Sequence, residues 1–256
     1  MKNYKGYLID LDGTMYRGNE VIEHAPVFIQ ELNERGIPYL FLTNNSSKTQ
    51  EQVSKKLNDL GIESKPDNVF NSSMATAKYI KDTFPGSTCY CIGEEGLFRA
   101  LERESIKVTD SEQCDVVVIG IDRDITYEKL VKACLAVRNG AHFISTNSDH
   151  ALPTERGFLP GNGALTSVIS VSTGVKPQFV GKPESIIVEQ ALQVLGTEKQ
   201  DTILVGDNYN TDIQAGIRAE LDTLMVFTGV TPFEQYQSLP TKPTYFVQNL
   251  SEWFTN

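Results

Sequence analysis

Short, almost continuous apolar runs recur along the chain and alternate with segments whose apolar residues have helical spacing. "YKGYLI" (4–9), "IPYLFLT" (37–43) and "DTILVG" (201–206) are runs of this kind, and they are typical of strands buried on both faces. Segments 25–35 and 48–60 are amphipathic, and a glycine follows each of them, as is common where a helix ends. Strands that alternate with helices in this way predict a parallel α/β sheet covered on both faces.

The middle of the chain repeats this alternation, with enough material for an α/β domain of its own. We therefore expect one α/β domain inserted into another, with boundaries near 76–84 and 174–180, rather than one long sheet. The further strands are expected at 88–92, 115–121, 141–145 and 222–229, and the further helices at 95–103, 126–138, 163–173, 184–195 and 211–219.

Composition narrows the class of protein. A chain of 256 residues with 40% hydrophobic and 22% charged residues is expected to be an ordinary soluble globular protein. The net charge of −10 argues against nucleic acid or an anionic membrane as the main partner. The start of the chain does not resemble a signal peptide, no apolar run approaches a membrane span, and the four cysteines lack zinc-site spacing. A reduced, cytoplasmic compartment is the default expectation.

Four short polar motifs stand out, and three of them follow a predicted apolar strand. Taken singly, each is typical of a turn, a helix cap or a surface lysine. The carboxyl ends of parallel strands, however, meet at one edge of the sheet, where ligands bind. Their convergence there predicts a functional site. The motifs are Asp10-x-Asp12-Gly13-Thr14, Thr43-Asn44-Asn45-Ser46, Gly206-Asp207-x-x-x-Thr211-Asp212 and Gly181-Lys182-Pro183.

Several familiar sites do not fit these motifs. An EF-hand loop beginning at Asp10 would need glycine and acidic residues where Met15 and Val21 stand. The first strand ends in acidic residues rather than in the glycine-rich turn of a dinucleotide-binding fold, and no P-loop pattern occurs. The three histidines are too scattered along the chain to suggest a metal cluster.

A divalent metal ion would explain why two carboxylates share one strand end. Asp10, Asp12 and Asp207 offer hard oxygen ligands, and these suit Mg²⁺, which commonly also takes substrate phosphate oxygens. Metal binding would keep Asp10 ionised, and an ionised carboxylate can attack phosphorus. If Asp12 met the metal only through its backbone carbonyl, its carboxyl group would be free for proton transfer.

The remaining motifs supply groups that suit a phosphoryl group. The Thr43 hydroxyl, the Asn44 amide and the Lys182 ammonium are donors or cations able to neutralise phosphoryl oxygens. The residues themselves therefore indicate phosphoryl chemistry that depends on Mg²⁺.

In their order along the chain, "DLDGT", "TNN", "GKP" and "GDNYNTD" resemble the four motifs of the haloacid dehalogenase-like hydrolases, and the pattern is similar to their NagD-type phosphatases (subfamily IIA). The resemblance implies that Asp10 is the nucleophile and that Asp12 is the general acid and then the base. It implies Asp10, Asp12 and Asp207 as ligands of Mg²⁺, with Asp212 as a direct or outer-shell partner. The implied phosphate- or substrate-binding residues are Asp12, Gly13, Thr43, Asn44, Asn45, Lys182 and Asn208.

The lengths of the segments between these motifs indicate a subtype of that family. A short segment separates Asp10 from Thr43, whereas the segment between Thr43 and Lys182 is long enough for a whole domain. The resemblance therefore implies a Rossmann-like, doubly wound core at 1–78 and 178–256, with an inserted α/β cap of the C2 type at 79–177. Dehalogenases of the family lack the second aspartate, so Asp12 indicates phosphoester chemistry.

We expect a Mg²⁺-dependent phosphatase of small phosphorylated metabolites, either sugar phosphates or nucleotides, that acts through an aspartyl-phosphate. A phosphotransferase or mutase, and a phosphometabolite-binding sensor with little turnover, remain as alternatives. A homodimer formed through the cap is compatible with the family. In the polar loop 146–165, residues able to meet a leaving group are Asn147, Asp149, His150 and Arg156, although an ordinary exposed loop is the simpler interpretation.

Overall fold

The computed structural model describes residues 2–154 and 156–254, and the chain divides into two compact units. Unit 1 runs from the N-terminus to Thr43, from Gln50 to Phe70 and from Lys182 to the C-terminus. Unit 2 comprises 44–49 and 71–181. Compared with the predicted cap at 79–177, unit 2 also contains 44–49, 71–78 and 178–181. A helix that we did not predict begins at Ser72, and the hydroxyls of Ser72 and Ser73 donate to carbonyl oxygens of the segment 44–49.

Unit 1 is built on a six-stranded sheet in the order β15-β14-β13-β1-β4-β5. The central strand β1 is buried along its whole length and pairs in parallel with β13 and β4, so that Leu8 lies opposite Leu204 and Leu40. The strands are β1 (Gly6–Ile9), β4 (Tyr39–Thr43), β5 (Val69–Asn71), β13 (Thr202–Gly206), β14 (Asp222–Val226) and β15 (Tyr245–Val247).

Helices cover both faces of this sheet. On one face, α1 (Ala25–Glu34) and α2 (Gln50–Asp59) bury Phe28 and Leu57 against the alternate strand residues Ile9 and Val205. Successive residues of a strand point to opposite faces, so Leu8 and Leu204 point to the other face of the sheet. That face is covered by α7 (Ser185–Leu195) and α8 (Gln214–Arg218). Two-sided cover explains why the strands of this sheet are apolar at nearly every position.

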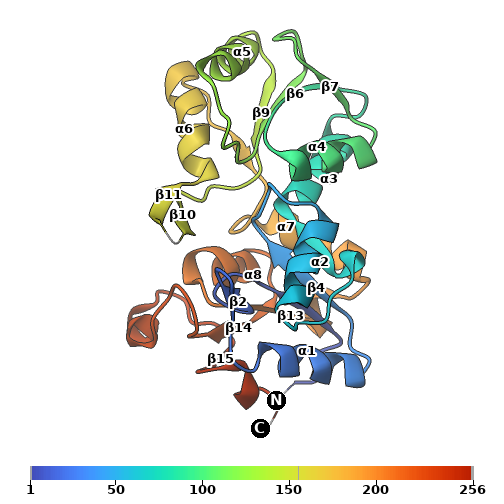
Figure 1. Cartoon of the computed structure of the whole chain (residues 1–256), viewed down its shortest axis with the longest axis vertical. Helices are drawn as coiled ribbons and strands as arrows, with labels where there is room; N and C mark the ends of the chain where they lie inside the picture. The colour runs from blue at the N-terminus through green and yellow to red at the C-terminus, as the bar shows by residue number, and fades with distance from the viewer. Residues whose placement is uncertain (1, 155, 255–256) are drawn as a thin grey trace. The chain divides into compact units, whose positions relative to one another are not determined.

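Unit 2 has its own five-stranded parallel sheet, in the order β12-β9-β8-β6-β7. Its strands are β6 (Thr88–Ile92), β7 (Lys107–Thr109), β8 (Val116–Ile119), β9 (His142–Ser145) and β12 (Gln178–Phe179). Its helices α3 (Ser72–Thr83) and α4 (Glu95–Arg103) lie on one face, and α5 (Tyr127–Arg138) and α6 (Asn162–Thr173) lie on the other (Figure 1).

The α/β fold class, with a parallel core sheet and an inserted second parallel sheet, is confirmed. The expected helices and strands are present with ends shifted by a few residues. The stretch expected to be a polar loop contains a hairpin of β10 (Ala151–Thr154) and β11 (Gly157–Pro160), and β2 (Tyr16–Arg17) and β3 (Glu20–Val21) form another. All four cysteines are free thiols. No helix in residues 2–154 or 156–254 has the length and apolar character that crossing a bilayer requires.

Helix α1 provides a test of this packing in which one helix supplies both the variant and its control. Ile29 is fully buried against the sheet, whereas Val27 is 55% exposed. Ile29→Ala should lower the free energy of unfolding by about 2–5 kcal/mol, because it leaves a cavity. Val27→Ala should change it by less than about 0.5 kcal/mol. Urea unfolding followed by circular dichroism measures both, and equal losses would contradict the layer assignment.

Candidate active site

Asp10 is the first residue after β1, and it is held at the sheet edge by both its backbone and its side chain. Its N–H donates to the Val205 carbonyl oxygen at 2.9 Å, and its side chain is almost completely buried. Carboxylate atom Oδ1 lies 2.5 Å from the ammonium Nζ of Lys182. The Thr14 hydroxyl lies within hydrogen-bond distance of Asp10 Oδ2 at 3.4 Å and of Asp207 Oδ1 at 3.1 Å. Residues far apart in sequence therefore meet at one point.

Lys182 is a buried cation surrounded by acceptors. Its Nζ lies 2.5 Å from Asp10 Oδ1, 2.7 Å from Asp212 Oδ1 and 2.9 Å from the Leu42 carbonyl oxygen. All three acceptors lie within hydrogen-bond distance of the ammonium group. Burial disfavours the charged form, but the carboxylates of Asp10 and Asp212 outweigh it and raise the pKa of Lys182 above its usual range. The lysine therefore stays protonated.

Asp10, Asp207 and Asp212 form a buried carboxylate cluster with ligand atoms within 4.8 Å of one another. Asp207 follows β13 and Asp212 lies in the helical turn Tyr209–Ile213. Burial first, and the Asp212 carboxylate second, raise the pKa of Asp207 to about 6. Burial and the same carboxylate raise the pKa of Asp10 well above its ordinary value, against the opposing effect of Lys182.

This carboxylate cluster fits a divalent cation. One lysine cannot neutralise three buried carboxylates, and an uncompensated buried charge is costly. Carboxylate oxygens brought this close together are the ligands that hard cations such as Mg²⁺ prefer. The oxygen ligands and the excess of negative over positive charge in the cluster therefore both suit a metal ion.

Glycines allow the backbone to pack directly against these carboxylates. Gly13 has a φ of +96°, and a Cβ atom there would lie 2.4 Å from Asp207 Oδ2. A Cβ atom on Gly229 would lie 2.0 Å from the same oxygen, and one on Gly206 would lie 2.3 Å from the Cβ of Asp212. Such distances are far inside van der Waals contact, so only glycine leaves the acidic side chains in place.

Asp12 is separate from the carboxylate cluster, and its side chain is exposed. Desolvation still raises the pKa of Asp12, although the Lys56 ammonium and a backbone hydrogen bond from Gly18 oppose the shift. Lys56 lies over the Tyr16 ring, with its Nζ 3.8 Å from the ring centroid. Asp10 and Asp12 therefore have different surroundings.

The other residues predicted to bind phosphate lie on or next to the same strand ends. Thr43 is the buried last residue of β4, and Asn44 and Asn45 follow it. The side-chain oxygen of Asn45 accepts the N–H groups of Ser47 and Lys48, both at 3.0 Å. Asn45 thus stabilises the turn that follows the strand.

Asn208 and Gly13 also have local structural contacts. The Asn208 side chain accepts the Asn210 N–H at 3.0 Å and so caps the turn that carries Asp212. The Gly13 N–H donates to the Tyr16 carbonyl oxygen at 2.7 Å, and the Gly13 carbonyl oxygen accepts the Thr228 hydroxyl at 2.7 Å. Both residues therefore shape the loops that surround the carboxylate cluster.

The loop after β14 also contacts the carboxylate cluster, although the sequence did not lead us to predict it. The Val230 N–H donates to Asp207 Oδ2 at 2.6 Å, and Gly229 packs on the same carboxylate. The available clue was "TG" at the end of the apolar run 222–229, because that run predicts a strand beside the one that carries Asp207. Loops at the carboxyl ends of neighbouring parallel strands share one edge.

Comparison with known proteins identifies relatives over almost the whole chain. A family model described as "Haloacid dehalogenase-like hydrolase" matches residues 7–107, and a second one, of HAD-hydrolase-like chains, matches residues 179–253. The chain is 57% identical to the 5'-nucleotidase YutF of Bacillus subtilis, covering 99% of this chain and 98% of that protein. It is 53% identical to an acid sugar phosphatase of Staphylococcus saprophyticus, covering 98% and 97%.

Solved structures agree with these relatives. A thermostable NPPase double mutant from Geobacillus stearothermophilus superposes with a TM-score of 0.94 at 58% identity, covering 99% of each chain. NagD from Escherichia coli K-12 superposes with a TM-score of 0.92 at 32% identity, covering 98% of each chain.

Two glycines of one loop test the packing around Asp207. Gly13 and Gly18 both have positive φ, but a Cβ atom on Gly18 would meet nothing within 4 Å. Gly13→Ala should displace Asp207 and weaken divalent-cation binding about tenfold or more. Gly18→Ala also places a side chain at a positive φ, of +56°, but meets no neighbouring atom, so this variant should bind the cation as the parent does. Titration calorimetry with MgCl₂ measures this difference, and equal affinities in the two variants would refute the packing argument.

Proposed function

This chain belongs to the haloacid dehalogenase-like hydrolases and is a NagD-type phosphatase of small metabolites, and we propose that it cleaves phosphate monoesters through an aspartyl-phosphate on Asp10. The observation that carries the proposal is the position of the Asp10 carboxylate, between the Lys182 ammonium and the acidic side chains of Asp207 and Asp212. The relatives named as a 5'-nucleotidase and as an acid sugar phosphatase favour nucleoside monophosphates and sugar phosphates as substrates.

We assign Mg²⁺ to the carboxylate cluster. Asp10 and Asp207 would bind it with their carboxylates, Asp12 would use its backbone carbonyl, and Asp212 would bind directly or through water. When bound, Mg²⁺ supplies positive charge that keeps the carboxylates ionised and neutralises phosphoryl oxygens. The excess of buried negative charge supports this assignment.

In the first half of the reaction, a carboxylate oxygen of Asp10 attacks phosphorus, and the bond from phosphorus to the leaving-group oxygen breaks. The Asp12 carboxyl donates its proton to that oxygen. In the second half, Asp12 takes a proton from water as the water oxygen attacks phosphorus, so that phosphate leaves and Asp10 is regenerated. The raised pKa of Asp12 suits a group that holds a proton before it donates one.

The phosphoryl oxygens need donors and cations around them. Lys182 is a protonated ammonium in contact with Asp10 and is the cation proposed to bind them. The Thr43 hydroxyl and the Asn44 amide at the end of β4 are the proposed donors. Further support from the surrounding loops is assigned to Gly13, Asn45 and Asn208.

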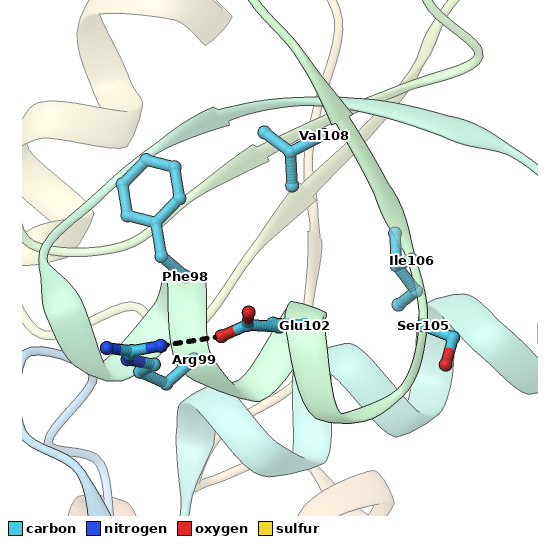
Figure 2. A pocket seen from close by; sticks show the side chains of 6 residues that line it. All are labelled: Phe98, Arg99, Glu102, Ser105, Ile106 and Val108. Atoms are coloured by element: carbon cyan, nitrogen blue, oxygen red, sulfur yellow. Dashed lines mark hydrogen bonds and ion pairs between the residues drawn. The ribbon is translucent and has the colours of Figure 1, made fainter.

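We propose that unit 2 is the cap domain and that its residues determine substrate specificity. We also propose that unit 2 pairs with a second copy of the chain through the edge strand β7. An open surface pocket of about 530 Å³ lies beside this strand and is lined by Phe98, Ile106 and Val108 together with the Arg99–Glu102 ion pair (Figure 2). Exposed edge strands pair readily, and a surface with both charge signs can face itself across a twofold axis.

Free cysteines accord with the predicted reduced, cytoplasmic compartment.

Turnover of p-nitrophenyl phosphate tests the mechanism. EDTA should abolish it and excess MgCl₂ should restore it, because the buried carboxylates need the cation. Asp10→Asn should lower kcat at least about 100-fold, because the nucleophile is lost. Asp59→Asn is the matched control, since Asp59 is an exposed partner of Lys55. Turnover that survives chelation, or persists in Asp10→Asn, would refute the proposal.

The roles of Asp12 and Asp207 can be separated by the same substitution at each position. Asp12→Asn should lower kcat by about 10²–10⁴-fold through loss of proton transfer. It should keep the rise in melting temperature that MgCl₂ produces, because its side chain lies outside the carboxylate cluster. Asp207→Asn should lose that rise. Thermal unfolding with and without MgCl₂ provides the measurement, and loss of the rise in Asp12→Asn would contradict the assignment.

A further inference from the structure

The segment 44–49 follows directly after Thr43 but packs within unit 2. The Asn44 side-chain Nδ2 donates to the Asp149 carboxylate, at 3.1 Å from Oδ1 and 3.3 Å from Oδ2. The Asn44 carbonyl oxygen accepts the Ser72 hydroxyl at 2.7 Å and the Asn147 Nδ2 at 2.9 Å. Both the side chain and the backbone of Asn44 are therefore held by residues of unit 2.

Asp149 is itself fixed in place. Its N–H donates to Asn147 Oδ1 at 3.1 Å, and its carbonyl oxygen accepts the Gly163 N–H at 2.8 Å from the start of α6. A Cβ atom on Gly161 would lie 2.2 Å from that carbonyl oxygen, and one on Gly163 would lie 2.4 Å from the Ser148 carbonyl oxygen. The glycines of "PGNGAL" therefore let the start of α6 pack closely on the backbone of Asp149.

Gly181 shares this arrangement. Its N–H donates to the Thr146 carbonyl oxygen at 2.8 Å, and a Cβ atom there would lie 2.6 Å from Asn44 Oδ1. The missing side chain makes room for the carboxamide of Asn44, whose other end is bound to Asp149. The loop that begins at Thr146 thus contacts both the residue after Thr43 and the residue before Lys182.

We propose that Asp149 is a positioning residue for phosphoryl transfer, acting through the side chain of Asn44. By accepting the Asn44 Nδ2, it fixes the carboxamide and the backbone that follows Thr43, where the phosphoryl oxygens bind. The inference rests on the proposed function of Thr43 and Asn44. It differs from the sequence-based suggestion that Asp149 meets the leaving group, because the carboxylate is bound to Asn44 instead.

Inhibition by inorganic phosphate distinguishes a residue that positions the phosphoryl site from a residue that contacts the leaving group. Inorganic phosphate has no leaving group, so a residue that only contacts the leaving group leaves phosphate inhibition unchanged. A residue that positions the phosphoryl site alters phosphate inhibition and affects every substrate by a similar factor. Misplacing groups around a reacting centre by about 1 Å can cost about 100-fold in rate.

The experiment compares Asp149→Ala and Asp149→Asn with the parent chain and with Asp110→Ala, a control at an exposed aspartate of the same unit. It measures kcat and KM for p-nitrophenyl phosphate and for ribose 5-phosphate, and the inhibition constant of inorganic phosphate. Melting temperatures show that each variant is folded. Asp149→Asn keeps one oxygen able to accept the Asn44 Nδ2, so it should rescue much of the loss.

We expect Asp149→Ala to lower kcat/KM for both substrates by a similar factor of about ten or more and to raise the inhibition constant of phosphate at least about fivefold. Asp149→Asn should stay within about threefold of the parent, and Asp110→Ala should match the parent. An unchanged inhibition constant, or a loss confined to one substrate, would overturn the inference. Absence of turnover in the parent chain would refute the proposed function as well, so the two failures are distinguishable.

Discussion

The buried contact of the Lys182 ammonium with the Asp10 and Asp212 carboxylates is the interaction on which the rest of the site depends. Burying charges is costly, and removing one partner of a buried pair typically costs about 3–5 kcal/mol, because the other charge remains. The contact joins the end of β1, the start of the segment before α7 and the turn after β13. The charge excess that remains after pairing makes a metal ion a natural fourth component.

This arrangement follows from the direction of the strands. Because β1, β4 and β13 are parallel neighbours, residues just beyond their carboxyl ends meet without any contact nearby in sequence. The pattern of apolar strands alone was therefore enough to predict that Asp10, Thr43 and Asp207 lie at one edge of the sheet, since each follows or ends a nearly continuous apolar run. Strand patterning gave less support for the position of Lys182, because the strand before it, β12, has only two residues.

Other parts of the structure could not be predicted in this way. Helix α3 buries Ser72, Ser73 and Thr76, and the first two donate their hydroxyls to carbonyl oxygens of the segment 44–49. A helix face that is buried through polar contacts carries no apolar periodicity, so the sequence resembles a loop there. The contact between Asn44 and Asp149 joins positions more than a hundred residues apart and depends on glycine-mediated close packing. Neither leaves a periodic pattern in the sequence.

Attack of Asp10 on phosphorus leaves a covalent aspartyl-phosphate, and trapping this intermediate is a direct test of the mechanism. The chain would be mixed with p-nitrophenyl phosphate and MgCl₂, quenched in acid within the first turnover and digested for peptide mass spectrometry. We expect one added phosphoryl group on the peptide that contains Asp10, located at that carboxylate and removed by hydroxylamine. Steady turnover with no phosphoryl group on Asp10 at any quench time, or one found on another residue, would contradict it.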